Sequence, residues 1–127
     1  MRIYLSACWD RRAELVAVRE LLRADGHEVV ARWLDEKDDV RTNRERTAAA
    51  RHCIEDITEC GPFVAFTEFG GRVERGGRWV ELGVALEQGC RVIICGPREE
   101  NIFHHMETTE QVNTVAELRE LLRGATT

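Results

Sequence analysis

Phe63-Val64-Ala65-Phe66-Thr67 is a continuous apolar run with no polar alternation. Such a run is typical of a strand in a parallel sheet whose two faces are both covered by helices. A second run of this kind, Arg91-Val92-Ile93-Ile94-Cys95, follows after a segment with helical periodicity. Two buried strands separated by a helix predict a parallel βαβ unit with a right-handed crossover.

The rest of the chain extends this alternation in both directions. We expect further strands at 3–8, 27–33 and 111–113. We expect a first helix from Asp10, as its N-cap, to Gly26, and a second from about Asn43 to Cys60. A third helix carries Glu81 and ends at Gly89, and a fourth runs from Thr114 to Gly124. The pattern predicts an α/β, doubly wound (flavodoxin-like) three-layer domain with a mostly parallel sheet of about five strands. At 127 residues, the whole range 1–127 is expected to form a single domain.

Composition excludes several classes of function. The net charge of −5 disfavours binding of a nucleic acid polymer, which requires a cationic surface. No apolar segment is long enough to span a bilayer, so no membrane association is expected. The N-terminus runs into a strand pattern without signal-peptide anatomy, which predicts a cytoplasmic location. The five cysteines show no paired or zinc-ligand spacing, so we interpret them as small buried residues and expect no metal site.

The glycine-rich stretch Gly76-Gly77-Arg78-Trp79-Val80-Glu81-Leu82 leads into a helix that carries one acidic residue. We expect Glu81 in the first turn, where the helix dipole favours an ionised carboxylate. It lies beside an apolar stripe made by Trp79, Leu82, Ala85 and Leu86. A carboxylate placed in this way suits the floor of a cleft, although first-turn glutamates are also common for the dipole reason alone.

The segment 68–77 contains four glycines and follows the strand at 63–67. Ligands in open α/β sheets bind at the carboxyl ends of the strands, and this is where such a loop would lie. The turn at 6–10 and Glu81 would converge at the same edge. The sequence therefore predicts a ligand site formed by these three segments.

Ile3-Tyr4-Leu5-Ser6-Ala7-Cys8-Trp9, followed by Gly77-Arg78-Trp79-Val80-Glu81-Leu82-Gly83-Val84-Ala85-Leu86, resembles the nucleoside 2-deoxyribosyltransferase family, including its nucleotide N-hydrolase relatives. The resemblance spans most of the chain, and the Glu-Leu-Gly helix is its sharpest element. It implies cleavage of the N-glycosidic bond of a (deoxy)nucleoside or its 5′-monophosphate, with transfer of the sugar to a base or to water. Glu81 would be the nucleophile that forms a covalent glycosyl ester.

The same resemblance implies that Tyr4 orients Glu81 and that Trp9 lines the base pocket. Structural roles, as an interior Tyr and as a Trp covering the edge of the sheet, are the alternatives. Relatives carry an Asp just before the third strand, where this sequence has Gly61. We expect Glu68 to be the substitute acid, and we interpret Asp56 as a surface or capping charge.

Transferases that act on free deoxynucleosides carry an Asp six residues before the nucleophile, whereas this chain has Arg75. An Arg favours a 5′-phosphate because its planar fork matches phosphate oxygens. The arginines could equally form a solvated face together with Glu68 and Glu74. The expected substrate-binding residues are Ser6, Ala7, Trp9, Gly70, Gly71, Arg75, Gly77 and Arg78.

The expected partner is a small-molecule nucleoside or nucleotide, and no cofactor is expected because the nucleophile and the acid are both side chains. The family implies a homodimer or higher homo-oligomer, in which Asn101 or Asn113 could complete a neighbouring site. His104 and His105 are adjacent and lack a ligand cluster, so we expect them at the pocket rim or at a subunit contact. The alternatives to an enzyme are a catalytically inactive nucleotide-binding module and a structural domain that acts through protein contacts.

Overall fold

A computed structural model describes residues 1–36, 42–67 and 76–124. Its strands form one parallel sheet in the order β2-β1-β3-β4-β5, so the expected α/β, flavodoxin-like fold is confirmed. The strands are β1 (Arg2–Ser6), β2 (Glu28–Val29), β3 (Pro62–Phe66), β4 (Arg91–Cys95) and β5 (Glu110–Val112). The α-helices are α1 (Arg12–Ala24), α2 (Asn43–Glu59), α3 (Gly77–Glu87) and α4 (Val115–Gly124). Three short 3-10 helices are η1 (Trp9–Arg11), η2 (Arg32–Asp35) and η3 (Ile102–His105).

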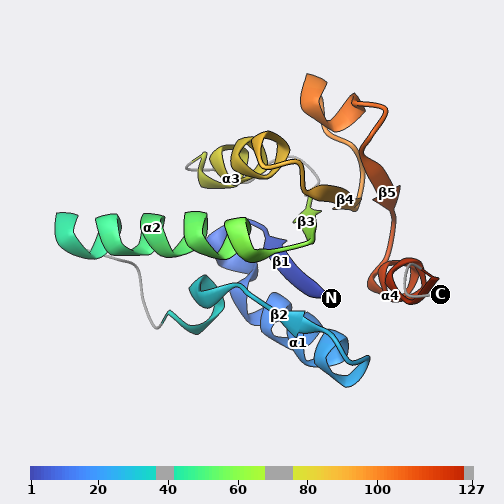
Figure 1. Ribbon diagram of the computed structural model, residues 1–127, viewed down its shortest axis with the longest axis horizontal. Coiled ribbons are helices and arrows are strands. Elements are labelled where there is room, and N and C mark those ends of the chain that lie inside the picture. The colour runs from blue at the N-terminus through green and yellow to red at the C-terminus, as the bar shows by residue number, and fades with distance from the viewer. Residues whose placement is uncertain (37–41, 68–75, 125–127) are drawn as a thin grey trace.

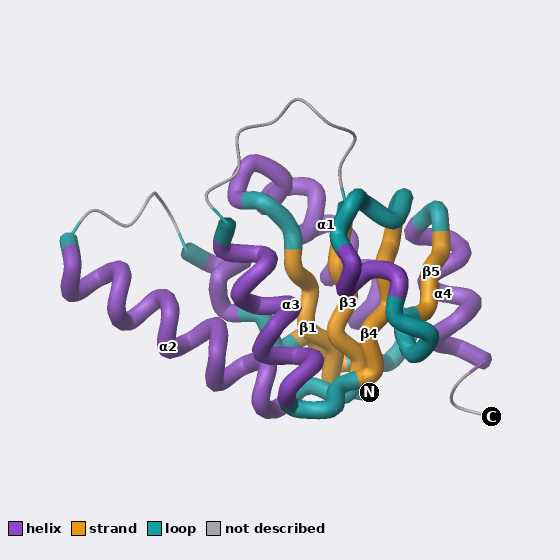
Figure 2. Tube along the Cα trace, turned by 90° about the horizontal axis from the view of Figure 1, so that it is seen from above, coloured by secondary structure: helices purple, strands orange, loops and turns teal. Residues whose placement is uncertain are grey.

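The helices form layers on both faces of the sheet. Figures 1 and 2 show α2 and α3 side by side on one face, with α1 and α4 on the other. All five residues of the central strand β3 are buried, as expected for a parallel strand covered on both sides. The register pairs Ser6 with Ala65 and Phe66 with Cys95, so β1, β3 and β4 end at one edge of the sheet.

The second strand is shorter than the sequence pattern predicted, and the prediction of 27–33 was wrong beyond Val29. The chain turns into η2, where the Trp33 indole Nε1 donates to the carbonyl oxygen of Leu5 at 2.8 Å. This bond holds the indole, which is 7% exposed, against β1. The first helix also starts later than expected, because Asp10 lies within η1 and makes no side-chain cap for α1.

Asp56 and Gly61 lie differently from the sequence interpretation. Asp56 is buried, and it accepts hydrogen bonds from the Arg32 backbone N–H at 2.8 Å and from Arg32 Nε at 2.9 Å. It is therefore an internal anchor for the start of η2 and not a surface charge. The Gly61 N–H donates to the Arg2 carbonyl oxygen, which places Gly61 at the amino-terminal edge of the sheet. An acid at position 61 would lie at the opposite edge from Ser6.

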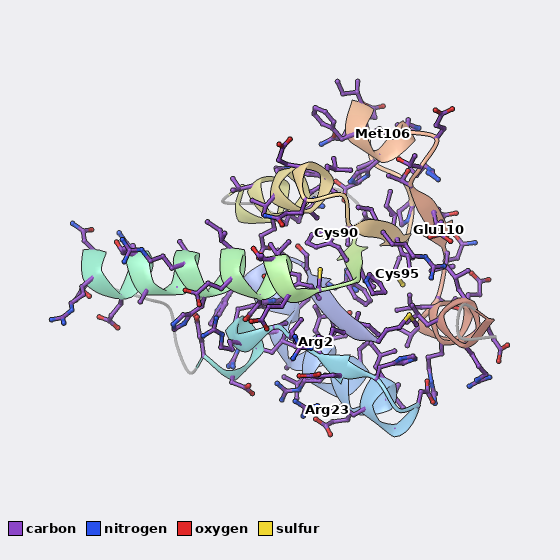
Figure 3. The ribbon with its side chains drawn as sticks, viewed as in Figure 1. Arg2, Arg23, Cys90, Cys95, Met106 and Glu110 are labelled. Carbon is purple, nitrogen blue, oxygen red and sulfur yellow. The ribbon has the colours of Figure 1, made fainter. Side chains whose placement is uncertain are left out.

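The described parts of the chain contain no helix long and apolar enough to cross a membrane. Three large apolar side chains on and next to η3 are exposed. This segment projects from the layered body, with Met106 at its end (Figure 3). The three side chains are those of Ile102, Phe103 and Met106. The homo-oligomer expected from the sequence remains a prediction.

Candidate active site

The Glu81 carboxylate is held by two hydroxyl groups from β1. Tyr4 Oη donates to Glu81 Oε2, and Ser6 Oγ donates to Glu81 Oε1 at 2.9 Å. Alternate residues of a strand face the same side, so Tyr4 and Ser6 both point toward α3, which packs against β1. Both donors are almost completely buried. The arrangement fixes both carboxylate oxygens from one rigid strand.

Glu81 is the fifth residue of α3, in the second turn, and not in the first turn as the sequence predicted. Burial raises the pKa of Glu81, and the hydrogen bonds from Tyr4, Ser6 and Cys53 act in the opposite direction. The expected preference for the ionised form through the helix dipole is therefore outweighed by desolvation. The pKa of Tyr4 is raised well above its ordinary value, mainly by burial and then by the charge of Glu81. Tyr4 thus stays protonated and remains a hydrogen-bond donor to Glu81.

Cys53 on α2 is a third neighbour of this carboxylate, and the sequence did not identify it. Burial raises the pKa of its thiol to about 12, with a further contribution from the charge of Glu81. A thiol with this pKa is neutral near pH 7 and is a poor nucleophile. The only sequence signal was its place in the apolar stripe of α2, which does not reveal that the stripe faces Glu81.

A cavity of about 640 Å³ opens beside Glu81, a size in the range of small-molecule sites. Its lining includes an aromatic pair, Trp9 and Trp33, whose ring centroids lie 6.3 Å apart. Trp9 is 37% exposed, and the Arg12 guanidinium lies 5.0 Å from the centroid of its ring. The remaining walls come from α2, from the start of α3 and from two carboxyl residues, Asp10 and Glu36.

The amino terminus of α3 forms the wall next to Glu81. Gly76 is its N-cap and has φ +85°, a conformation that favours glycine. Among the described residues outside its own helix and its chain neighbours, no heavy atom lies within 4 Å of the position that a Cβ on Gly77 would occupy. Arg78 is buried, and its guanidinium lies 2.8 Å from Glu99 Oε2 and 3.9 Å from the Trp79 ring centroid. The positive charge at this wall is therefore anchored by a carboxylate.

The structure brings together many of the residues expected from the sequence. Tyr4, Ser6 and Glu81 are in contact, and Ser6, which the sequence predicted as a substrate-binding residue, donates its hydroxyl to Glu81. The cavity is lined by Ala7, Trp9, Gly77 and Arg78. The other expected site residues lie outside the described part of the chain; these are Glu68, Gly70, Gly71 and Arg75.

His104 is not at a pocket rim or a subunit surface, contrary to expectation. It is 1% exposed, its Nδ1 accepts the Glu99 N–H at 3.0 Å, and its ring packs on Trp79. His104 therefore supports the η3 segment and the Glu99 that anchors Arg78. Within the described residues, no cluster of His, Cys, Asp and Glu could hold a metal ion.

No family model and no curated protein matches the sequence. Among solved structures, the CMP N-glycosidase BcmB of Clostridium botulinum matches over 97% of this chain and 98% of its own, with 21% identity and a TM-score of 0.62. A 2-deoxyribosyltransferase from Bacillus psychrosaccharolyticus matches over 94% and 90%, with 17% identity and a TM-score of 0.75.

The receiver domain of the hybrid histidine kinase CckA also matches, over 100% of both chains, with 15% identity and a TM-score of 0.56. One fold thus serves both enzymes and a receiver domain, and function must be argued from the site. At these identities the comparisons establish the fold. This chain has the fold that the N-glycosidase and the deoxyribosyltransferase share.

Proposed function

We propose that this protein cleaves the N-glycosidic bond of a (deoxy)nucleoside or nucleoside 5′-monophosphate, with Glu81 as the nucleophile. The observation that carries the proposal is the Glu81 carboxylate, which is held by Tyr4 and Ser6 and borders a cavity that Trp9 also lines. A half-buried carboxylate held by two hydroxyls has little structural purpose, because taking a charge even partly out of water costs free energy. Such perturbed groups in a cleft are typical of active sites.

The chemistry follows from this geometry. A Glu81 oxygen attacks the anomeric carbon, the bond from carbon to base breaks with its electron pair going to the base, and a glycosyl ester forms. Water or a second base then attacks the ester, and Glu81 leaves as a carboxylate. The hydroxyls of Tyr4 and Ser6 orient the carboxylate for attack and stabilise it as it leaves. Stacking of the base on Trp9 would contribute roughly 1–3 kcal/mol, by analogy with single-stranded nucleic-acid sites.

We further propose that a 5′-phosphate binds near the amino terminus of α3. The N–H groups of the first turn lack helical partners, and the helix dipole favours an anion there. The open space at Gly77 supports this placement. The role of Arg75 as a phosphate ligand stays a prediction, and Arg78 would contribute through its charge as part of the Arg78–Glu99 pair.

The test is base release from a panel of ribonucleosides, deoxyribonucleosides and their 5′-monophosphates, followed by chromatography. We expect release from at least one class, with the 5′-monophosphates preferred, and no release by Glu81→Ala or Glu81→Gln. Glu87→Gln is the matched control, because Glu87 is an exposed carboxylate on the same helix. Wild-type rates in either Glu81 variant would refute the assignment of the nucleophile.

The inactive-module alternative drew its main support from the missing acid at Gly61. Position 61 lies at the wrong edge of the sheet to serve the site, so a glycine there carries no information about turnover. A thermal shift with these ligands, without base release by the wild-type protein, would favour the inactive module. An equal or reversed preference between nucleosides and monophosphates would discard the phosphate subsite alone.

A further inference from the structure

We propose that Glu36 is the catalytic residue that donates a proton to the leaving base. The inference rests on the function proposed above, which requires an acid, because a nucleobase leaves poorly as an anion. Position 61 is at the opposite edge of the sheet from Ser6. Glu36 and Asp10 are the carboxyl residues besides Glu81 that the described lining of the cavity contains.

Glu36 lines the same cavity as Trp9 and Trp33, the aromatic pair on which we expect the base to bind. It follows η2 directly, and its backbone N–H donates to the Trp33 carbonyl oxygen at 3.3 Å. Trp33 is fixed in turn by its bond to Leu5 and packs against Trp9. We therefore place the base near Trp9 and Glu36 and the sugar near Glu81, since all three residues line the same cavity.

Both carboxyl groups lie near Cys53, which lines the same cavity. The charges of both Glu81 and Glu36 contribute to the raised pKa of this thiol, which places Cys53 within electrostatic range of each. A substrate bound between the two carboxyls would have its anomeric carbon toward one and its base toward the other. This is the arrangement that nucleophilic attack with acid assistance requires.

The surroundings of Glu36 favour its protonated form. Burial raises its pKa, and the positive charges of Arg12 from α1 and His52 from α2 act in the opposite direction. Glu36 is half-buried, whereas Asp10, the other candidate in the cavity, is exposed to solvent. Since a general acid must retain its proton at the working pH, Glu36 fits the role better than Asp10.

The bond from Glu81 to the anomeric carbon forms while the glycosidic bond breaks, and the proton on Glu36 moves to the base, which leaves neutral. Glu36 is then a carboxylate. In hydrolysis, it accepts a proton from the water that attacks the ester, Glu81 departs as a carboxylate, and both groups return to their starting states.

The experiment measures kcat, KM and their pH dependence for wild type, Glu36→Gln, Glu81→Gln and Asp35→Asn, using the panel nucleotide that the wild type cleaves fastest. Asp35 is the control, because it is the adjacent carboxylate but pairs with Arg19 and does not line the cavity. We expect kcat of Glu36→Gln to fall roughly 10²- to 10⁴-fold, with KM changed much less. The wild-type rate should fall as the pH rises through the pKa of Glu36, and this basic limb should be absent in Glu36→Gln.

The outcomes separate the two proposals. If the wild type releases no base from any panel member, the proposed function fails and this inference fails with it. If the wild type is active and Glu81→Gln is not, but Glu36→Gln keeps the wild-type kcat and the basic limb, the role of Glu36 alone is overturned. Circular dichroism and thermal unfolding of each variant check the fold, and Glu36→Asp, which keeps a carboxyl group, should retain the basic limb.

Discussion

Tyr4→Phe removes one hydroxyl group and leaves the rest of the site in place. The Phe ring keeps the stacking on Phe63, whose ring centroid is 5.5 Å away with an interplanar angle of 5°. Tyr4 is 0% exposed, so water cannot easily replace the lost hydroxyl. The variant therefore removes the hydrogen bond from Tyr4 to Glu81 and leaves Ser6 and Cys53 as donors.

The magnitude follows from the charge on the acceptor. A hydrogen bond to a charged group contributes about 1.5–3 kcal/mol, and each 1.36 kcal/mol corresponds to a tenfold change in rate. If the bond stabilises the carboxylate as it leaves the glycosyl ester, its loss should slow breakdown of the ester roughly 10- to 150-fold. Attack on the substrate should suffer less, because a carboxylate with one fewer donor is a stronger base.

The assay is rapid-quench measurement of base release together with intact mass spectrometry. We expect a burst of base of about one equivalent per active site followed by a slow phase, with the glycosyl adduct detected on the protein. The acid limb of the pH profile should move to higher pH, because the bond from Tyr4 opposes the burial that raises the pKa of Glu81. A variant with the wild-type steady-state rate and an unmoved acid limb would refute this role for Tyr4.

Two further predictions concern the stability of the scaffold. Asp56→Ala removes the buried partner of the Arg32 N–H and guanidinium, and should lower the free energy of unfolding, measured in urea, by about 2–4 kcal/mol. The loss is limited because the Arg32 side chain is half-exposed and can be hydrated when its partner is gone. A loss below 1 kcal/mol would contradict the anchoring role. Gly96→Ala would place a Cβ 2.4 Å from Thr67 Oγ1, at a residue whose φ is +122°. It should lower the free energy of unfolding by about 1–3 kcal/mol, which would appear as a lower thermal midpoint. An unchanged midpoint would contradict this, because it would mean that the β3–β4 edge relaxes freely.

Local sequence patterns predicted correctly those strands whose burial is visible in the sequence itself. The apolar runs of β3 and β4 predicted both strands to within a residue, because burial on both faces leaves no polar positions in them. The β2 region was predicted wrongly because its outcome depends on a bond between Trp33 and Leu5, which are distant in sequence. Asp56 was misread for the same reason, since its partner Arg32 precedes it by 24 residues.

In the candidate site, too, contacts within one strand could be predicted from the sequence, and contacts between separate elements could not. Tyr4 and Ser6 are two residues apart on one strand, so their common face follows from the sequence alone. Cys53 and Glu36 come from a helix and a turn, and their approach to Glu81 depends on how these segments pack. The raised pKa of Glu81 was also hidden, because desolvation is a property of the packed fold and the dipole argument from the sequence had the opposite sign.

Under the proposed function, the residues that position the nucleophile and the residue that recognises the base lie on different elements of the fold. The hydroxyl donors to Glu81 belong to β1, whose backbone is bonded to strands on both sides, so their positions are fixed by the sheet. Trp9 and Glu36 belong to short turns at the carboxyl edge, and such connections tolerate sequence change better than strands do. Substitution within β1 should therefore alter the rate for every substrate in the same proportion. Under the proposed function, substitution of Trp9 should instead change the relative rates among bases, because we expect the base to stack on its ring.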